Sequence, residues 1–116
     1  MEIIRNARLK EENNLLGSVI ADLLKLSINN ILEQNIDKES DRPIVIHERV
    51  HQVSYVVEGE GFVLIDNKTM KICKDNLIII EKEQEHSFFT ETKLILRHFY
   101  CPYECFDLAD RIIVKT

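Results

Sequence analysis

The stretch that decides the fold covers residues 47–86 and reads HERVHQVSYVVEGEGFVLIDNKTMKICKDNLIIIEKEQEH. It contains short runs of β-branched, aromatic and aliphatic residues, such as VSYVV at 53–57 and LIII at 77–80, which favour β-strands. Between these runs stand Gly, Asp and Asn, which accept the backbone conformations that turns require. The expected turns lie at residues 59–61, 66–68 and 74–76.

Further runs of the same kind extend the pattern on both sides. We expect additional strands at residues 43–49, 62–65, 70–73, 86–89 and 94–100. Short strands separated by turns at intervals of about ten residues are typical of an antiparallel sandwich or barrel. The sequence therefore predicts a mainly β protein in which residues 94–100 form the last barrel strand.

The region before this pattern has two interpretations. Apolar residues recur between positions 15 and 32 at helical spacing, and this stripe taken alone predicts a helix. A small barrel, however, needs further strands to close its sheets and protect their edges. We therefore favour a strand at residues 27–36 and leave helix and strand open for residues 15–26.

Composition limits the functions to be considered. The 116 residues suit one domain, and 45% hydrophobic with 30% charged residues is ordinary for a globular protein. A net charge of −5 without a basic stripe argues against nucleic-acid binding. No run approaches the roughly 18 apolar residues of a membrane helix. The polar start MEIIRNARLKEENN lacks the apolar segment of a secretory signal, so we expect a cytoplasmic protein.

Two segments resemble the two sequence motifs of the cupin superfamily. In HERVHQVSYVVEGE, at 47–60, Gln52 stands seven residues before Gly59, in the position of an acidic or amide metal ligand. In KDNLIIIEKEQEH, at 74–86, Asp75 and His86 match the aspartate and the histidine of the second motif. The resemblance implies a single-domain, jelly-roll-like antiparallel β-barrel over residues 1–116, with its motif core at about 43–100.

The first motif departs from the family pattern at its histidines. The family has two histidines one residue apart; if His47 is the second, Val45 takes the place of the first. Under the shorter family spacing, Ile46 and Glu48 fill the two positions instead. His47 and Glu48 thus remain alternatives, because neighbouring residues of a strand face opposite sides.

The resemblance also implies a site inside the barrel. The metal ligands would be His47, Gln52 and His86, with Glu48 as the alternative to His47. Nitrogen and oxygen ligands of this kind suit one divalent transition metal, namely Zn, Mn, Fe or Ni. The ligand pocket would contain Gln52, His86 and His98; strand alternation places His98 on the same face as Leu94 and Leu96.

Three classes of function follow from this interpretation. The first is a metal-binding cupin acting on a small polar metabolite as an isomerase, lyase or dioxygenase. The second is a metal-free binding or sensor module, which the missing histidine favours. The third is a dimeric scaffold without catalysis. Cupins often form homodimers, and residues 102–116, beyond the expected last barrel strand, could supply an intersubunit strand or helix.

Overall fold

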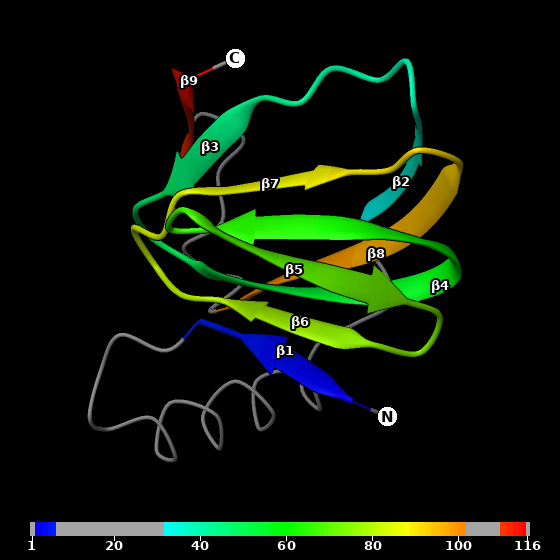
Figure 1. Ribbon diagram of the computed structural model, residues 1–116. Helices are drawn as coiled ribbons and strands as arrows, with labels where there is room; N and C mark the ends of the chain where they lie inside the picture. The colour runs from blue at the N-terminus through cyan, green and yellow to red at the C-terminus, as the bar shows by residue number, and fades with distance from the viewer. Residues whose placement is uncertain (1, 7–31, 102–109, 116) are drawn as a thin grey trace.

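Nine strands make up the described part of the chain (Figure 1), residues 2–6, 32–101 and 110–115 of a computed structural model. They are β1 (Ile3–Arg5), β2 (Leu32–Asp37), β3 (Ile44–His47), β4 (His51–Ile65), β5 (Lys68–Cys73), β6 (Leu77–Ile80), β7 (His86–Phe89), β8 (Lys93–Cys101) and β9 (Arg111–Lys115). The helix-or-strand question at residues 15–26 lies outside the described residues. So does the first part of the strand expected at 27–36, whose second part is β2.

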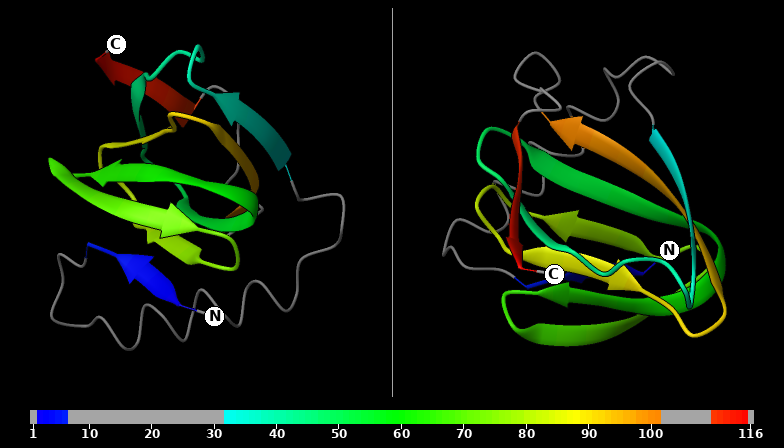
Figure 2. Two further views of the ribbon diagram at one scale, coloured as in Figure 1. Left: turned by 45° about the vertical axis from the view of Figure 1, so that its right-hand side comes forward. Right: turned by 90° about the horizontal axis from the view of Figure 1, so that it is seen from above.

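Two sheets face each other and share the long strand β4 (Figure 2). The first half of β4 pairs with β6 and β8, and β8 pairs in turn with β2. The second half pairs with β5 and β7, and β7 leads through β3 to β9. These pairs are antiparallel, whereas β1 joins β6 in parallel. The mainly β, antiparallel barrel predicted from the sequence is confirmed.

The strand β4 passes from one sheet to the other at Gly59 and Gly61, where nearby backbone carbonyls leave no room for a side chain. The pairing of β4 with β8 shifts register between Val56 and Glu58, next to Gly59 with its φ of 89°. A Cβ at Gly59 would lie 2.1 Å from the carbonyl oxygen of Lys93, so a side chain does not fit there. The turn predicted at 59–61 is therefore wrong: the chain bends within one strand and does not reverse.

The other two predicted turns are present. Asp66 and Asn67 have φ values of 46° and 67° and close the β4–β5 hairpin, in which Ile65 pairs with Lys68. Asp75, with a φ of 72°, stands in the turn between β5 and β6. Asp and Asn tolerate this left-handed conformation better than most residues, which is why the sequence signal was reliable here.

The ends of the chain contribute two strands that the sequence did not predict. β1 lies against β6, and the Arg5 guanidinium forms a largely buried ion pair of 2.6 Å with Glu81. β9 pairs with β3 of the same chain, so the prediction that the barrel ends at residue 100 is wrong. Residues 102–109 lie outside the described residues, and the homodimer stays a prediction, as does the extent of one domain over residues 1–116.

Inward-facing side chains divide the barrel interior into two halves. Alternate residues of β4, β7 and β8 point inward because side chains of a strand alternate between its faces. In one half of the interior these residues are apolar and form the core, which comprises Ile36, Val56, Val63, Ile65, Ile72, Ile78, Ile80, Phe88, Leu94 and Leu96. In the other half, around Gln52, His86 and His98, they are largely polar, and this polar half holds the candidate site.

No helix among the described residues combines the length and the apolar character that crossing a membrane would require.

Candidate ligand pocket in the barrel

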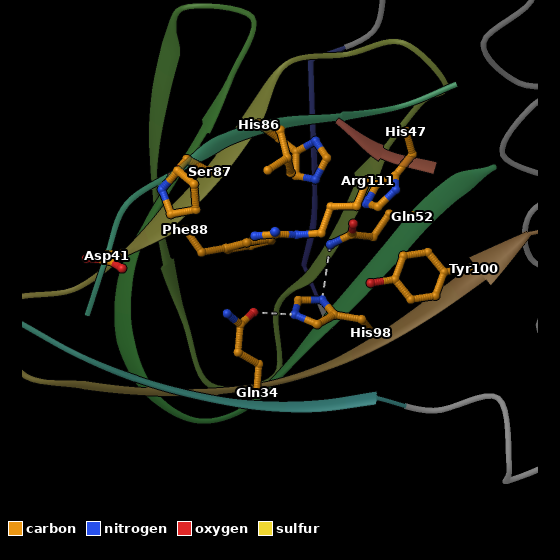
Figure 3. A pocket seen from close by; sticks show the side chains of 12 residues that line it. Gln34, Asp41, His47, Gln52, His86, Ser87, Phe88, His98, Tyr100 and Arg111 are labelled. Atoms are coloured by element: carbon orange, nitrogen blue, oxygen red, sulfur yellow. Dashed lines mark hydrogen bonds between the residues drawn. The ribbon is translucent and has the colours of Figure 1, made fainter. Parts of the chain in front are cut away.

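A cavity of about 90 Å³ lies in the polar half of the barrel (Figure 3). Five strands supply its walls, since β2, β3, β4, β7 and β8 each direct at least one polar side chain toward it. β9 adds Arg111, and the loop after β2 adds Asp41 and Pro43. The lining residues are Gln34, Asp41, Pro43, Val45, His47, Gln52, His86, Ser87, Phe88, His98, Tyr100 and Arg111.

A second, wider cavity of about 550 Å³ adjoins the first. The two cavities share Gln34, Asp41, Pro43 and Arg111, so these four residues mark the passage between them. Ser40, Arg42 and Ile113 line the wider cavity and not the inner one. We call the first the inner cavity and the second the outer cavity.

His98 is held by hydrogen bonds on both sides of its ring. Its Nε2 lies 2.8 Å from Oε1 of Gln34, which accepts hydrogen bonds only, so Nε2 carries the proton. Its Nδ1 therefore accepts, from the Ser54 hydroxyl at 2.7 Å and from Nε2 of Gln52 at 3.1 Å. Burial lowers the pKa of His98 to about 3, which keeps the ring neutral. Both nitrogens are occupied by the protein itself.

His86 and His47 face each other across the inner cavity. Their ring centroids are 5.4 Å apart, with the planes inclined by 30°. Nδ1 of His86 lies 3.0 Å from the backbone oxygen of Gln84, so Nδ1 donates and the Nε2 lone pair stays available. Burial, with smaller contributions from His47 and Arg111, lowers the pKa of His86 to about 4.

His47 carries an atom that lacks a partner. Its exposed fraction is 6%, and its buried Nδ1 has no hydrogen bond among the described residues. Burial lowers its pKa, and Asp110 opposes this shift in part. The Oγ of Ser87, also in the cavity wall, is a second buried polar atom without a partner. Unsatisfied buried polar atoms are rare in folded proteins, so two in one cavity wall mark a place where a ligand can bind.

Tyr100 completes the polar half. Its ring packs edge-on against His47, with centroids 5.4 Å apart at 70°. Burial raises the pKa of its hydroxyl to about 12, so Tyr100 remains a protonated hydrogen-bond donor over the physiological range. Neutral imidazoles and a protonated phenol together suit a ligand with several oxygen atoms.

The structure brings four of the sequence-derived site residues together. His47, Gln52, His86 and His98 all line the inner cavity and are buried. Glu48, the alternative to His47, is exposed after the end of β3 and does not line the cavity. Between these two alternatives, the structure therefore places His47 inside.

Sequence reasoning missed Gln34, Ser87, Tyr100 and Arg111. Tyr100 stands two residues after His98, so strand alternation could have identified it. Gln34 and Arg111 reach the pocket through pairing of β2 with β8 and of β9 with β3. Such long-range pairing leaves no local signal in the sequence.

A cupin-type barrel implies a bound metal ion, and the candidate ligands of this pocket fit such an ion only in part. Two imidazoles that share one ion at 2.0–2.1 Å have ring centroids roughly 5 Å apart, close to the 5.4 Å between His47 and His86. The bond from His86 to a backbone carbonyl is also usual for a ligating histidine. Gln52, however, offers a neutral amide, and no three His, Cys, Asp or Glu side chains among the described residues gather as a metal would require.

No family model matches the chain, and no curated protein matches it. Solved structures do match: a double-stranded β-helix protein from Klebsiella pneumoniae has a TM-score of 0.64 at 12% identity, over 78% of this chain and 80% of that protein. A cupin protein from Bacteroides fragilis has a TM-score of 0.52 at 12% identity, over 62% and 65%. The chain has a cupin-type fold.

A third matching structure is that of Pac13 from Streptomyces, described as a nucleoside dehydratase. Its TM-score is 0.58 at 14% identity, over 78% of this chain and 72% of Pac13. Among the first matching structures, the chain spans between 47% and 80% of the length of the matched protein. At these identities the likeness concerns the fold.

Proposed function

We propose that this protein binds a small, oxygen-rich metabolite in the inner cavity and transfers a proton on it, as lyases and isomerases do. The observation that carries the proposal is the pair His47 and His86: two neutral imidazoles 5.4 Å apart in a cavity wall that holds unpartnered buried polar atoms. Both imidazoles are unprotonated at neutral pH and can accept a proton, although a pKa of about 4 makes His86 a weak base.

The neighbouring groups suit the same chemistry. A proton removed next to a carbonyl leaves negative charge on the carbonyl oxygen, whereas a leaving hydroxyl takes up a proton and departs as water. The Tyr100 hydroxyl, whose pKa is raised to about 12, can donate a hydrogen bond to such an oxygen. His98 holds the Gln52 amide through its Nδ1 and thereby fixes a polar group beside the reacting pair. Pac13 is a nucleoside dehydratase, which supports elimination as one candidate reaction.

Proton transfer can be tested once a ligand is known. Native mass spectrometry of the freshly purified full chain would identify a co-purified metabolite, and NMR in D₂O would follow deuterium incorporation into it. We expect exchange with the wild type and at least about a hundredfold slower exchange with His47→Gln or His86→Gln. His51→Gln is the matched control, because His51 accepts a hydrogen bond from the Lys82 backbone and does not line the cavity. Exchange at the wild-type rate in both pocket variants would refute the assignment.

A second candidate is a metal-dependent site formed by His47, Gln52 and His86. The 5.4 Å separation of the two imidazoles favours it, and a bound Zn, Mn, Fe or Ni would supply a Lewis acid. Elemental analysis of protein purified without a histidine tag and without chelator tests it directly. About one equivalent of metal in the wild type, lost in His86→Ala but kept in His51→Ala, would support this candidate. Metal content that is unchanged in His86→Ala would contradict it.

A further inference from the structure

Arg111 stands where the inner and outer cavities meet. It begins β9 and pairs with His47 of β3, so the ladder brings it beside the histidine pair. Its side chain lines both cavities, and Figure 3 shows it reaching from β9 into the pocket toward Phe88. A ligand that extends through both cavities lies beside this guanidinium.

The positive charge of Arg111 is felt in the pocket and is not neutralised within the described residues. Arg111 contributes to lowering the pKa of both His47 and His86, which means that its field reaches both rings. The arginines that form ion pairs with described carboxylates are Arg5, Arg42 and Arg97. Asp41 lines the same passage but lies beyond ion-pair distance of Arg111.

Two carboxylates stand near Arg111 without forming an ion pair with it. Asp41 lines the same passage, and Asp110 accepts hydrogen bonds from the backbone N–H groups of Glu48 and Arg49. The pocket histidines are neutral, and protonation would only add positive charge. Tyr100 keeps its proton. A guanidinium has a planar fork of donors that matches the two oxygens of a carboxylate or a phosphate. Because no described carboxylate forms an ion pair with Arg111, its guanidinium is available to the carboxylate or phosphate of a ligand.

We propose that Arg111 forms an anion subsite, so that the ligand of this pocket is a small oxygenated metabolite with a carboxylate or phosphate group at its outer end. This inference rests on the proposed function for the location of the reacting end. The anionic group binds at Arg111, and the neutral polar end enters the inner cavity toward His47, His86 and Ser87. At about 90 Å³ the inner cavity holds a group the size of a few water molecules, which limits the buried end to a few heavy atoms.

The test uses the full chain, labelled with ¹⁵N, and three small probes. Lactate presents a carboxylate, inorganic phosphate presents a phosphate, and glycerol is neutral. In the wild type, at least one of the two anions should shift the Arg111 Nε signal and the amides of the pocket strands, and the anion that does so identifies the ligand class. This result is obtained with the wild-type protein and depends on no variant.

Two variants, each of which removes one positive charge, test whether anion binding depends on Arg111 itself. Arg111→Gln should weaken binding of that anion about tenfold or more, since a charge-assisted contact is lost. Arg97→Gln is the matched control: Arg97 is 49% exposed, contacts Glu33 at 3.7 Å and does not line the pocket. It should bind the anion as the wild type does. Both variants should retain a dispersed spectrum, because both arginines are exposed.

The remaining outcomes overturn the inference. Equal weakening in both variants would mean that net charge and not a subsite attracts the anion. If neither anion shifts the Arg111 signal while glycerol shifts pocket amides, the anion subsite is wrong and the proposed small-molecule pocket stands. If none of the three probes shifts pocket signals, the anion subsite is contradicted and the pocket itself loses its support.

Discussion

The two halves of the barrel interior share strands but differ in their inward-facing side chains, which are apolar in one half and largely polar in the other. On β8, Leu94 and Leu96 point into one half, and His98 and Tyr100 continue the same face into the other. On β4, Val56 belongs to the apolar half. The apolar core and the candidate pocket thus use different lengths of the same strands.

This division has a physical reason. Burial of apolar side chains is the main favourable contribution to folding, and about 25 cal/mol is gained per Å² removed from water. Burial of neutral histidines and amides gains little, because each hydrogen bond within the protein replaces one with water. The apolar half therefore stabilises the barrel, while the polar half retains groups whose hydrogen-bonding capacity a ligand can use.

The largest loss of stability is expected when a side chain of the apolar half is truncated. Leu96 is fully buried. Its replacement by Ala should lower the unfolding free energy of the protein by about 3 kcal/mol, because the space left by the side chain is not refilled. Urea denaturation measures this loss. Ile95→Ala removes an aliphatic group from the neighbouring, partly exposed position and should cost about 1 kcal/mol. Equal losses in both variants would contradict the assignment of the core.

The polar half should make stability depend on pH. In the unfolded chain a histidine binds a proton below about pH 6.5, whereas folded His86 and His98 do so only below about 4 and about 3. The unfolded state therefore takes up more protons, and stability should fall as pH falls from 7 toward 4. The slope is up to about 1.4 kcal/mol per pH unit for each histidine.

Urea midpoints at pH 7.5, 6 and 5 measure this dependence. His98→Leu should show a shallower slope than the wild type, because one of the two buried imidazoles no longer titrates. A stability that stays constant between pH 7.5 and 5 would show that the two histidines are not buried as neutral groups.

A smaller effect is expected from the bond that fixes the His98 ring. Gln34→Leu leaves the buried Nε2–H of His98 without its acceptor and should cost about 1–2 kcal/mol. Gln34→Glu keeps an acceptor at this place and should restore most of the stability above the carboxyl pKa. Thermal or urea unfolding of the two variants compares them; an equal loss in both would mean that the hydrogen bond contributes nothing.

Much of the fold could be predicted from the sequence because its signals are local. The strand runs at 77–80 and 86–89 match β6 and β7, and the Asp-Asn turn closes the β4–β5 hairpin. The turn predicted at 59–61 failed for a non-local reason: the glycines there allow close approach of the Lys93 and Phe89 carbonyls. A glycine accepts both a turn and a bend, so the sequence alone does not distinguish them.

The candidate site was predictable where strand alternation applies and unpredictable where pairing is distant. Gln52, His86 and His98 lie on strands whose inward face can be read from neighbouring residues. Gln34 lies more than sixty positions before His98, its partner, and Arg111 lies a similar distance after His47. The register that joins such strands is decided by the packed sheet, and the sequence around either residue does not contain it.

If the polar half holds neutral imidazoles in fixed orientations, the ¹⁵N NMR signals of the histidine rings will report it. At pH 6 we expect His86 as the neutral form protonated on Nδ1 and His98 as the neutral form protonated on Nε2. Ring signals that titrate near pH 6.5, as those of an exposed histidine do, would contradict it.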